Sequence, residues 1–419
     1  MISRPIDILF ILLWCCLCLF PDGQYSGHIL STSLLIHNIF YCYKCIINKN
    51  GELCILYLFM IMFSIPPFEY YVFKQSIIEY YFDAVSSEYI YAVTLQLFLF
   101  HIVFPLSLDF KHKQQLQLYK NNFIYVICLA ITMYCIVASG SGGSIFSEGG
   151  YRGALESGSR DSLLAYGMIF LMLSMVSAHS RVKRNLVYVV SLIYIAKNLL
   201  YGGRIETMSL CIAIYSIRFQ YIISLKRALL LAFLGFCFMT FWGIMRQSGN
   251  LEVGLTSEDL AENATANDVF YSSMRVYFLL DYGYLDFTDR LMSFLNFLLS
   301  AVMPVSSPLA NLSTYMIDYY NCGGGGLIST YFYIWGGYLG IIFLALVLSK
   351  LYNLGNKNNS SFYMRFYVVL LLAMAPRWFA YYPIQIIKYC LYGVIIAYIL
   401  NTISKKVYKN NTLCQGFFK

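Results

Sequence analysis

Charged residues are scarce in this chain. Only 12% of its 419 residues are Asp, Glu, Lys or Arg, whereas 59% are hydrophobic. A water-soluble protein covers its core with roughly a quarter charged residues, so a water-soluble protein is excluded here. The apolar side chains must instead be covered by lipid, and the sequence predicts an integral membrane protein.

Histidine is also rare, and its distribution argues against a metal centre. The five histidines are His28, His37, His101, His112 and His179. No spacing among them places two on one helical face as ligands. The glycine run at 323–326 lacks the Lys and Ser or Thr that follow in a nucleotide-binding P-loop. We therefore predict no metal ion and no cofactor.

Apolar runs long enough to cross a bilayer recur along the whole chain. They are continuous, whereas barrel strands would alternate inward and outward residues, so we expect helices. The predicted spans are 6–20, 28–44, 53–72, 89–108, 122–139, 161–179, 185–201, 205–223, 227–246, 327–349, 362–380 and 383–403. The sequence thus predicts an all-α, polytopic transmembrane helix bundle of about twelve spans, forming a single membrane domain over residues 1–419.

Basic residues indicate how this bundle is threaded. Lys and Arg in short loops stay on the cytoplasmic side of a membrane. The basic loops here alternate along the chain, and most of the 29 basic residues fall on the same side as both termini. We therefore expect cytoplasmic N and C termini. Because the net charge of +8 belongs to that side, it gives no indication of nucleic-acid binding.

Arginine predominates among the basic residues of the other, outer side. Its rigid fork of donors suits a phosphate or a carboxylate, whereas lysine suffices as a topological charge. The skew predicts an anionic ligand outside the cytoplasm, and pairing with the outer acidic residues is the open alternative. The outer arginines are Arg152, Arg160, Arg204, Arg246, Arg275, Arg290 and Arg377.

Two outer loops are longer than a connection needs. The first, at 139–160, is rich in Gly and Ser. The second, at 247–326, begins as a polar and acidic segment. Its later part, 291–310, is apolar but interrupted by Pro304 and Pro308. We expect this part to form a re-entrant or interfacial helix.

Arginines at three places on the outer side stand beside glycine or aromatic residues. A glycine pair precedes Arg204, and Arg246 follows the aromatic stretch at 236–242. Arg275 and Arg290 flank a tyrosine-rich run that contains Asp281 and Tyr282. Aromatic rings beside arginine suit a sugar with a phosphate. A tight helical hairpin and an interfacial aromatic belt are the structural alternatives.

Three of these motifs resemble the bacterial O-antigen polymerase family. They are GGR opening a helix at 202–204, an aromatic helix ending in GIMR at 243–246, and the glycine-rich helix YFYIWGGYLG at 331–340. This family polymerises oligosaccharide repeat units for lipopolysaccharide and capsule synthesis. The resemblance implies a protein of the bacterial inner (cytoplasmic) membrane with two sizeable periplasmic loops. The second loop here lacks the catalytic histidine of the related ligases, which favours a polymerase.

The resemblance also implies a reaction and its partners. A metal-independent membrane glycosyltransferase would move a growing glycan from undecaprenyl pyrophosphate to a sugar hydroxyl of an incoming lipid-linked repeat unit, at the periplasmic face. Arginine forks would stabilise the departing diphosphate. Its partners would be undecaprenyl-pyrophosphate-linked oligosaccharide, membrane lipid and a chain-length regulator protein.

Residues of this chain are assigned to that reaction as follows. Arg204 and Arg246 are the catalytic arginines. Asp281 is the candidate base, because it lies in the tyrosine-rich run between two arginines. The expected substrate-binding residues are Arg152, Arg160, Arg275, Arg290, Arg377 and Tyr282.

A flippase or transporter of lipid-linked oligosaccharide is the alternative function. A carrier needs access from both sides of the membrane, and intramembrane charges and inverted repeats are its usual marks. Lys197 and Lys388 are the charges nearest to mid-helix positions, and no inverted repeat is visible. This pattern favours the polymerase.

Overall fold

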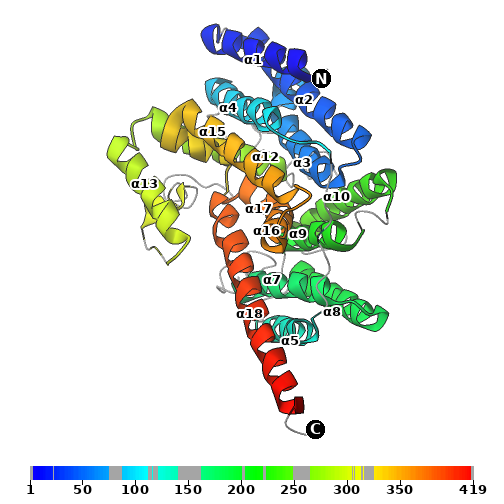
Figure 1. The fold of residues 1–419 in the computed structure, drawn as a ribbon. Coiled ribbons are helices and arrows are strands. Elements are labelled where there is room, and N and C mark those ends of the chain that lie inside the picture. The colour runs from blue at the N-terminus through cyan, green and yellow to red at the C-terminus, as the bar shows by residue number, and fades with distance from the viewer. Residues whose placement is uncertain are drawn as a thin grey trace. The chain divides into compact units, whose positions relative to one another are not determined.

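The computed structural model is built of helices (Figure 1). It describes residues 3–21, 23–74, 87–111, 116, 121–139, 162–200, 203–219, 223–248, 265–303, 305, 307–312, 315 and 325–416. Within these ranges every regular element is a helix and there is no strand. The prediction of an all-α fold is confirmed for this part of the chain.

The described residues belong to two compact units. The first comprises Met1–His112, Thr256–Asn356 and Ala375–Lys388. Its main helices are α1 (Ser3–Leu19), α2 (Gly23–Ile47), α3 (Gly51–Phe68), α4 (Ser87–Leu106), α12 (Thr265–Asp281), α13 (Phe287–Ser300), α15 (Ile328–Gly355) and α17 (Ala375–Ala380). Its shorter elements are η1 (Glu69–Phe73), η4 (Pro308–Ala310) and η5 (Pro383–Ile386).

The second unit comprises Lys113–Leu255, Lys357–Met374 and Tyr389–Lys419. Its helices are α5 (Asn122–Ala138), α7 (Ser162–Ser177), α8 (Arg181–Leu200), α9 (Arg204–Ile214), η3 (Tyr215–Phe219), α10 (Leu225–Ser248), α16 (Phe362–Ala373) and α18 (Lys388–Gly416). Most of the first predicted outer loop, from residue 140 to 160, lies outside the described residues.

Five helices of the described chain are long and apolar enough to cross a membrane. They are Tyr25–Ile47, Gly51–Phe73, Ser87–Leu106, Ile328–Gly355 and Pro383–Val407. Four shorter apolar helices are Pro5–Leu19, Asn122–Ala138, Leu163–Ser177 and Phe362–Ala373. Helix occurs in all twelve ranges predicted as spans. The five long helices named first have the length and composition of a helix that crosses a membrane.

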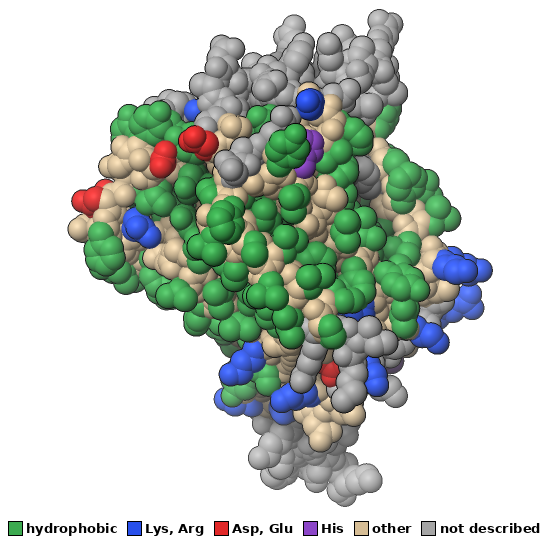
Figure 2. Space-filling view, turned by 90° about the horizontal axis from the view of Figure 1, so that it is seen from above, with side chains coloured by type: hydrophobic (Ala, Val, Ile, Leu, Met, Phe, Trp, Pro, Cys, Tyr) green, Lys and Arg blue, Asp and Glu red, His purple; other side chains and the backbone are tan. Residues whose placement is uncertain are grey.

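The outer surface of these helices is apolar. Hydrophobic side chains cover most of the described surface in Figure 2, and charged side chains stand mainly near its edges. On α15, for example, Leu339 is 77% exposed and Phe343 is 63% exposed. Apolar side chains in such number are stable only against a lipid or protein environment. The surface therefore supports membrane association.

One predicted span is divided in the structure. The range 362–380 contains two helices, because α16 ends at Ala373 and α17 begins at Ala375. Met374 closes α16 by donating its N–H to the carbonyl of Leu370 at 2.9 Å. Pro376 follows two residues after Met374, and a proline has no N–H to bond the carbonyl four residues before it. Hydropathy alone does not predict this break, because the sequence is apolar on both sides of it.

The later part of the second predicted loop forms a helix with an inverted pattern. In α13, Ser293 and Asn296 are buried, whereas Leu291, Leu295 and Leu298 are exposed. The indole of Trp335 donates to the Ser293 hydroxyl at 3.0 Å, and α13 packs against α15. Phe297, which is 3% exposed, is buried on the same helix. The re-entrant or interfacial character of this element stays a prediction.

A single asparagine holds together three helix ends of the first unit. The Asn50 side-chain oxygen caps α3 by accepting a hydrogen bond from the Leu53 N–H at 3.1 Å. Its amide donates to the carbonyl of Phe110 at 3.1 Å, after α4, and to the Tyr352 hydroxyl at 2.8 Å, near the end of α15. Asn50 is fully buried, so these bonds are not exchanged with water.

We predict that Asn50→Ala destabilises the protein strongly. The loss of the cap costs about 1 kcal/mol, and the loss of two buried hydrogen bonds costs about 1 kcal/mol each. The free energy of unfolding of the purified chain in detergent should therefore fall by about 3 kcal/mol.

Asn48→Ala is the matched control. Among the described residues the Asn48 amide donates to the Lys44 carbonyl, at 2.7 Å, and its side chain is half-buried. Its replacement should cost no more than about 1 kcal/mol. Equal effects of the two replacements would contradict the role assigned to Asn50.

Candidate functional site

Asp281 ends helix α12 in the first unit, where its carboxylate contacts helix α4. The Tyr89 hydroxyl, near the start of α4, donates a hydrogen bond to Asp281 Oδ2 at 2.8 Å. The Asp281 side chain is exposed. The bond fixes the orientation of a carboxylate that remains accessible from outside the protein.

Aromatic rings from three helices gather around this bond. The Tyr89 ring lies 5.7 Å from the Tyr277 ring and 5.9 Å from the Phe278 ring, both of α12. Tyr277 lies 5.9 Å from Tyr333 of α15, and Phe278 lies 4.0 Å from Tyr282. These five residues are called the tyrosine cluster. Their tilted and edge-on arrangements are those that aromatic pairs favour.

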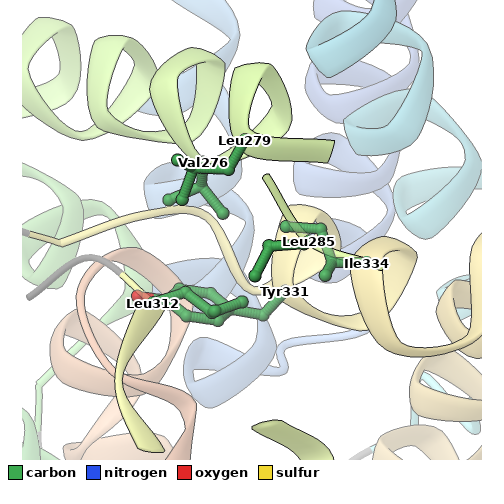
Figure 3. Packing of buried hydrophobic residues seen from close by; sticks show 6 residues of the cluster. All are labelled: Val276, Leu279, Leu285, Leu312, Tyr331 and Ile334. Carbon is green, nitrogen blue, oxygen red and sulfur yellow. The ribbon is translucent and has the colours of Figure 1, made fainter. Parts of the chain in front are cut away.

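A compact apolar core positions the cluster (Figure 3). Its members are Val276 and Leu279 of α12, Leu285 and Leu312 of the following segments, and Tyr331 and Ile334 of α15. Val276 and Leu279 are three residues apart and share one face of α12. Tyr277, Phe278 and Asp281 belong to other faces of the same helix. Burial of Val276 and Leu279 fixes the rotation of α12. It thereby fixes the directions in which Tyr277, Phe278 and Asp281 leave the helix.

The start of α15 is tied to α12 by a buried bond. The N–H of Leu327 donates to the Ser273 hydroxyl at 2.7 Å. This N–H precedes the first turn of α15, and the Ser273 hydroxyl accepts it. The glycines at 323 and 324 lie outside the described residues.

Burial raises the pKa of Tyr277 to about 12, and the neighbouring Tyr333, Asp281 and Glu88 contribute to the increase. At neutral pH the Tyr277 hydroxyl therefore keeps its proton. A protonated phenol both donates and accepts a hydrogen bond. The cluster thus combines neutral hydroxyls with a carboxylate, which suits a ligand rich in hydroxyl groups.

Two predicted arginines approach the tyrosine cluster. The Arg275 guanidinium lies 5.0 Å from the ring centroid of Tyr271 and 6.0 Å from that of Phe278. Arg290 Nε donates to the carbonyl of Ile334, the residue after Tyr333. Both arginines are half-buried. The structure therefore brings Arg275, Arg290, Asp281 and Tyr282 to one part of the first unit.

Arg377 lies elsewhere in the same unit, in the short helix α17. It is half-buried, and its carbonyl accepts the N–H of Tyr381 at 3.0 Å. The Gly326 N–H donates to the carbonyl of Ala380 at 3.1 Å, so the end of α17 contacts the segment before α15. The tyrosine cluster is formed mainly by α4, α12 and α15, and Arg377 stands on α17.

Arg204 and Arg246 belong to the second unit. Arg204 is half-buried and begins α9, directly after the cap residue Gly203. The Gly203 N–H donates to the carbonyl of Asn198 at 2.6 Å, which makes a tight turn between α8 and α9. This contact is compatible with the helical hairpin given as the structural alternative, and the functional and the structural interpretation of Arg204 both stay open.

The end of α10 lies against this turn. The indole of Trp242 donates to the carbonyl of Leu199, at the end of α8, at 3.1 Å. Trp242 stands one helical turn before Arg246, and Leu199 stands five residues before Arg204. The two helix ends that carry the predicted catalytic arginines are therefore neighbours. The side chain of Arg246, and all of Arg152 and Arg160, lie outside the described residues.

A buried polar cluster in the first unit was missed by the sequence analysis. His37 and Asn38 of α2, Ser64 of α3 and His101 of α4 are each 0% exposed. The Asn38 amide reaches the Ser64 hydroxyl at 2.7 Å and His101 Nδ1 at 2.8 Å. We refer to these four residues as the histidine–asparagine cluster. Ser31 and Asn38, seven residues apart on one face of a predicted span, are the signal that marked this buried face.

Metal ligands are not gathered in the described part of the chain. Within it, no group of three or more His, Cys, Asp or Glu side chains is able to hold a metal ion. The chemistry offered by the described residues is that of a carboxylate, phenols and guanidinium groups.

Comparison with known proteins gives no relative. No protein-family model, no curated protein and no solved structure matches this chain.

Proposed function

We propose that this chain is an O-antigen or surface polysaccharide polymerase of the bacterial inner (cytoplasmic) membrane. It transfers a growing glycan from undecaprenyl pyrophosphate to a sugar hydroxyl of an incoming lipid-linked repeat unit. The observation that carries this proposal is the tyrosine cluster with the Asp281 carboxylate in its midst and with Arg275 and Arg290 beside it.

The tyrosine cluster is assigned to the acceptor sugar. Sugar rings present C–H groups that pack on aromatic faces, and their hydroxyls donate to carboxylates. Tyr282 is 64% exposed and Tyr284 is 48% exposed, so both rings are accessible. Asp281 is the general base in this proposal, because its carboxylate accepts the proton of the attacking hydroxyl. Tyr89 positions that carboxylate through its hydrogen bond.

Arg204 and Arg246 are assigned to the diphosphate of the donor. As the acceptor oxygen bonds to the anomeric carbon, the bond from that carbon to the diphosphate oxygen breaks. The electron pair leaves with the diphosphate, and guanidinium forks stabilise the charge. The contact between the ends of α8 and α10 supports this assignment, since it gathers the two helix ends. Loss of one such contact typically raises the barrier by about 3 kcal/mol.

The proposal includes the membrane topology. The twelve helical ranges cross the membrane, both termini are cytoplasmic, and the active face is periplasmic. The exposed apolar face of α13 rests in the lipid at that side, next to the α15 helix on which Tyr333 stands. A chain-length regulator protein is the proposed protein partner.

The first test replaces Arg204 and Arg246 by lysine. Charge is kept, but the planar fork is lost. We expect each variant to polymerise on the order of 10²-fold more slowly, so that surface glycan separated by chain length shifts to single and short repeats. Arg181→Lys, at the exposed start of α8, is the control and should give full-length polymer. Normal polymer from both test variants would refute the diphosphate assignment.

The second test concerns the acceptor site. Asp281→Asn keeps the shape of the side chain but removes the base, so polymerisation should fall on the order of 10²-fold or more. Tyr89→Phe removes only the hydroxyl that orients Asp281, and its effect should be smaller, about tenfold. Polymer length and membrane protein level are measured together.

Glu88→Gln provides the control for this second test. Glu88 is also exposed and also acts on Tyr277, so it reports on negative charge in general. It should retain normal polymer length. If Glu88→Gln and Asp281→Asn had equal effects, Asp281 would not be the base.

A transporter or flippase of lipid-linked oligosaccharide is the second candidate function, and the histidine–asparagine cluster is the observation that raises it. Buried polar side chains within apolar helices are a frequent mark of carriers. Lys197 is less informative, because its amino group donates to the Ser139 carbonyl at 2.9 Å at the end of α5, as a cation at a helix C-terminus does.

Deletion of the gene separates the two functions. We expect lipid-linked single repeats to accumulate at the periplasmic face, since export continues without polymerisation. The face is assigned by the access of an added glycosidase in intact spheroplasts and in lysed ones. Accumulation on the cytoplasmic face would support the flippase and overturn the polymerase.

A further inference from the structure

The histidine–asparagine cluster lies in an otherwise apolar interior. The His37 ring centroid is 4.9 Å from that of Phe10, 4.8 Å from that of Tyr41 and 6.1 Å from that of Phe98. The His101 ring stacks on Phe379 at 5.9 Å. Both histidines are fully buried and close enough to interact electrostatically. Polar atoms in such surroundings are costly unless each has a hydrogen-bond partner.

The hydrogen bond of Ser64 determines the orientation of Asn38. The Ser64 hydroxyl donates its single proton to the carbonyl of Met60 at 2.7 Å. The Asn38 atom that lies 2.7 Å from this hydroxyl must therefore be a donor, which is the amide nitrogen Nδ2. Asn38 Oδ1 is then the remaining acceptor, and it has no hydrogen-bond partner among the described residues.

The orientation of Asn38 in turn determines the tautomer of His101. The second proton of Asn38 Nδ2 points to His101 Nδ1 at 2.8 Å, so that nitrogen accepts. A neutral imidazole with an accepting Nδ1 carries its proton on Nε2. His101 Nε2 is buried without a described partner. The cluster thus contains a buried N–H donor on α4 that no described protein atom accepts.

His37 adds one donor and one acceptor. Neither of its ring nitrogens makes a hydrogen bond of ordinary geometry to a described atom, although the ring interacts with the neighbouring Asn38 side chain. A neutral imidazole carries a proton on only one of the two nitrogens. Together with Asn38 Oδ1 and His101 Nε2–H, the cluster offers two donors and two acceptors. A bound cation would be repelled by the N–H donors, and a bound anion would be repelled by the lone pairs of the acceptors. A molecule that donates and accepts in equal number satisfies the set.

We propose that the histidine–asparagine cluster is a binding site for ordered water inside the first unit. Water donates two hydrogen bonds and accepts two, and buried waters typically have two to four polar partners. The site is enclosed by α2, α3 and α4 and uses His37, Asn38 and His101 as its ligands. A hydroxyl group of a lipid or glycan has the same hydrogen-bonding chemistry, and the experiment separates these sources.

His37→Phe is the decisive variant, because the direction in which it shifts the melting temperature shows whether water occupies the site. His37 makes no hydrogen bond of ordinary geometry to the described protein, although its ring interacts with the neighbouring Asn38 side chain. Phenylalanine preserves the ring contacts with Phe10 and Phe98. If water occupies the site, the variant deprives it of a ligand and the melting temperature of the purified chain falls, by roughly 2–4 °C. If the nitrogens are truly unsatisfied, their removal raises the melting temperature and overturns the proposal.

His28→Phe is the matched control. It places the same substitution on α2 at a half-buried position, and it should leave the melting temperature within about 1 °C. A fall for His37→Phe that appears only after lipid-linked oligosaccharide is added would identify a glycan hydroxyl and would also overturn the water assignment.

A second measurement uses the unmodified protein. In histidine-labelled protein, magnetisation should transfer from water to the His101 Nε2–H, and the transfer should persist in deuterated lipid. His101→Phe assigns the signal. Absence of the transfer, or its loss in deuterated lipid, would refute a water site. Neither measurement depends on polymerase activity, so the water site and the proposed function succeed or fail separately.

Discussion

The apolar exterior of these helices forces polar groups to find their partners within the protein. Outside there is no water to accept or donate, so each buried polar side chain must serve a structural or chemical purpose. Both units use the same solution. Asn50 caps α3 and bonds Tyr352 in the first unit, while Asn121 caps α5 and bonds Ser404 at 2.6 Å in the second. In each unit one asparagine side chain thus caps a helix start and bonds that start to a neighbouring helix.

The same constraint explains why the candidate site stands at helix ends. A carboxylate such as Asp281 is costly in the middle of an apolar helix, and it is therefore placed on the last residue of α12. Tyrosine suits this position, since its ring packs on apolar neighbours while its hydroxyl reaches a polar one. Tyr89 does both, since its ring packs on Tyr277 and its hydroxyl bonds Asp281. The resulting combination of rings and carboxylate is what a sugar ligand requires.

The sequence predicted local structure well and long-range contacts poorly. Apolar runs were sufficient to place helices in twelve ranges, because a continuous apolar run of helical length is a local property of the sequence. One of these ranges, 362–380, is divided near Pro376. The hydropathy of the run did not predict this break, because it takes no account of the N–H that proline lacks. The Tyr89–Asp281 bond joins residues 192 positions apart, and His101 meets Asn38 across 63 positions. No periodicity within one helix encodes such pairs.

The size of the histidine–asparagine cluster bears on the choice between polymerase and carrier. A pathway for an oligosaccharide needs an interior wide enough for sugar rings, whereas His37 and His101 are 0% exposed and packed against aromatic rings. Their hydrogen-bonding capacity matches one water molecule rather than a glycan. The accessible rings and the exposed carboxylate stand instead at the end of α12. Sugar chemistry is thus better served at this helix end, as a polymerase requires, than along the interior, as a carrier requires.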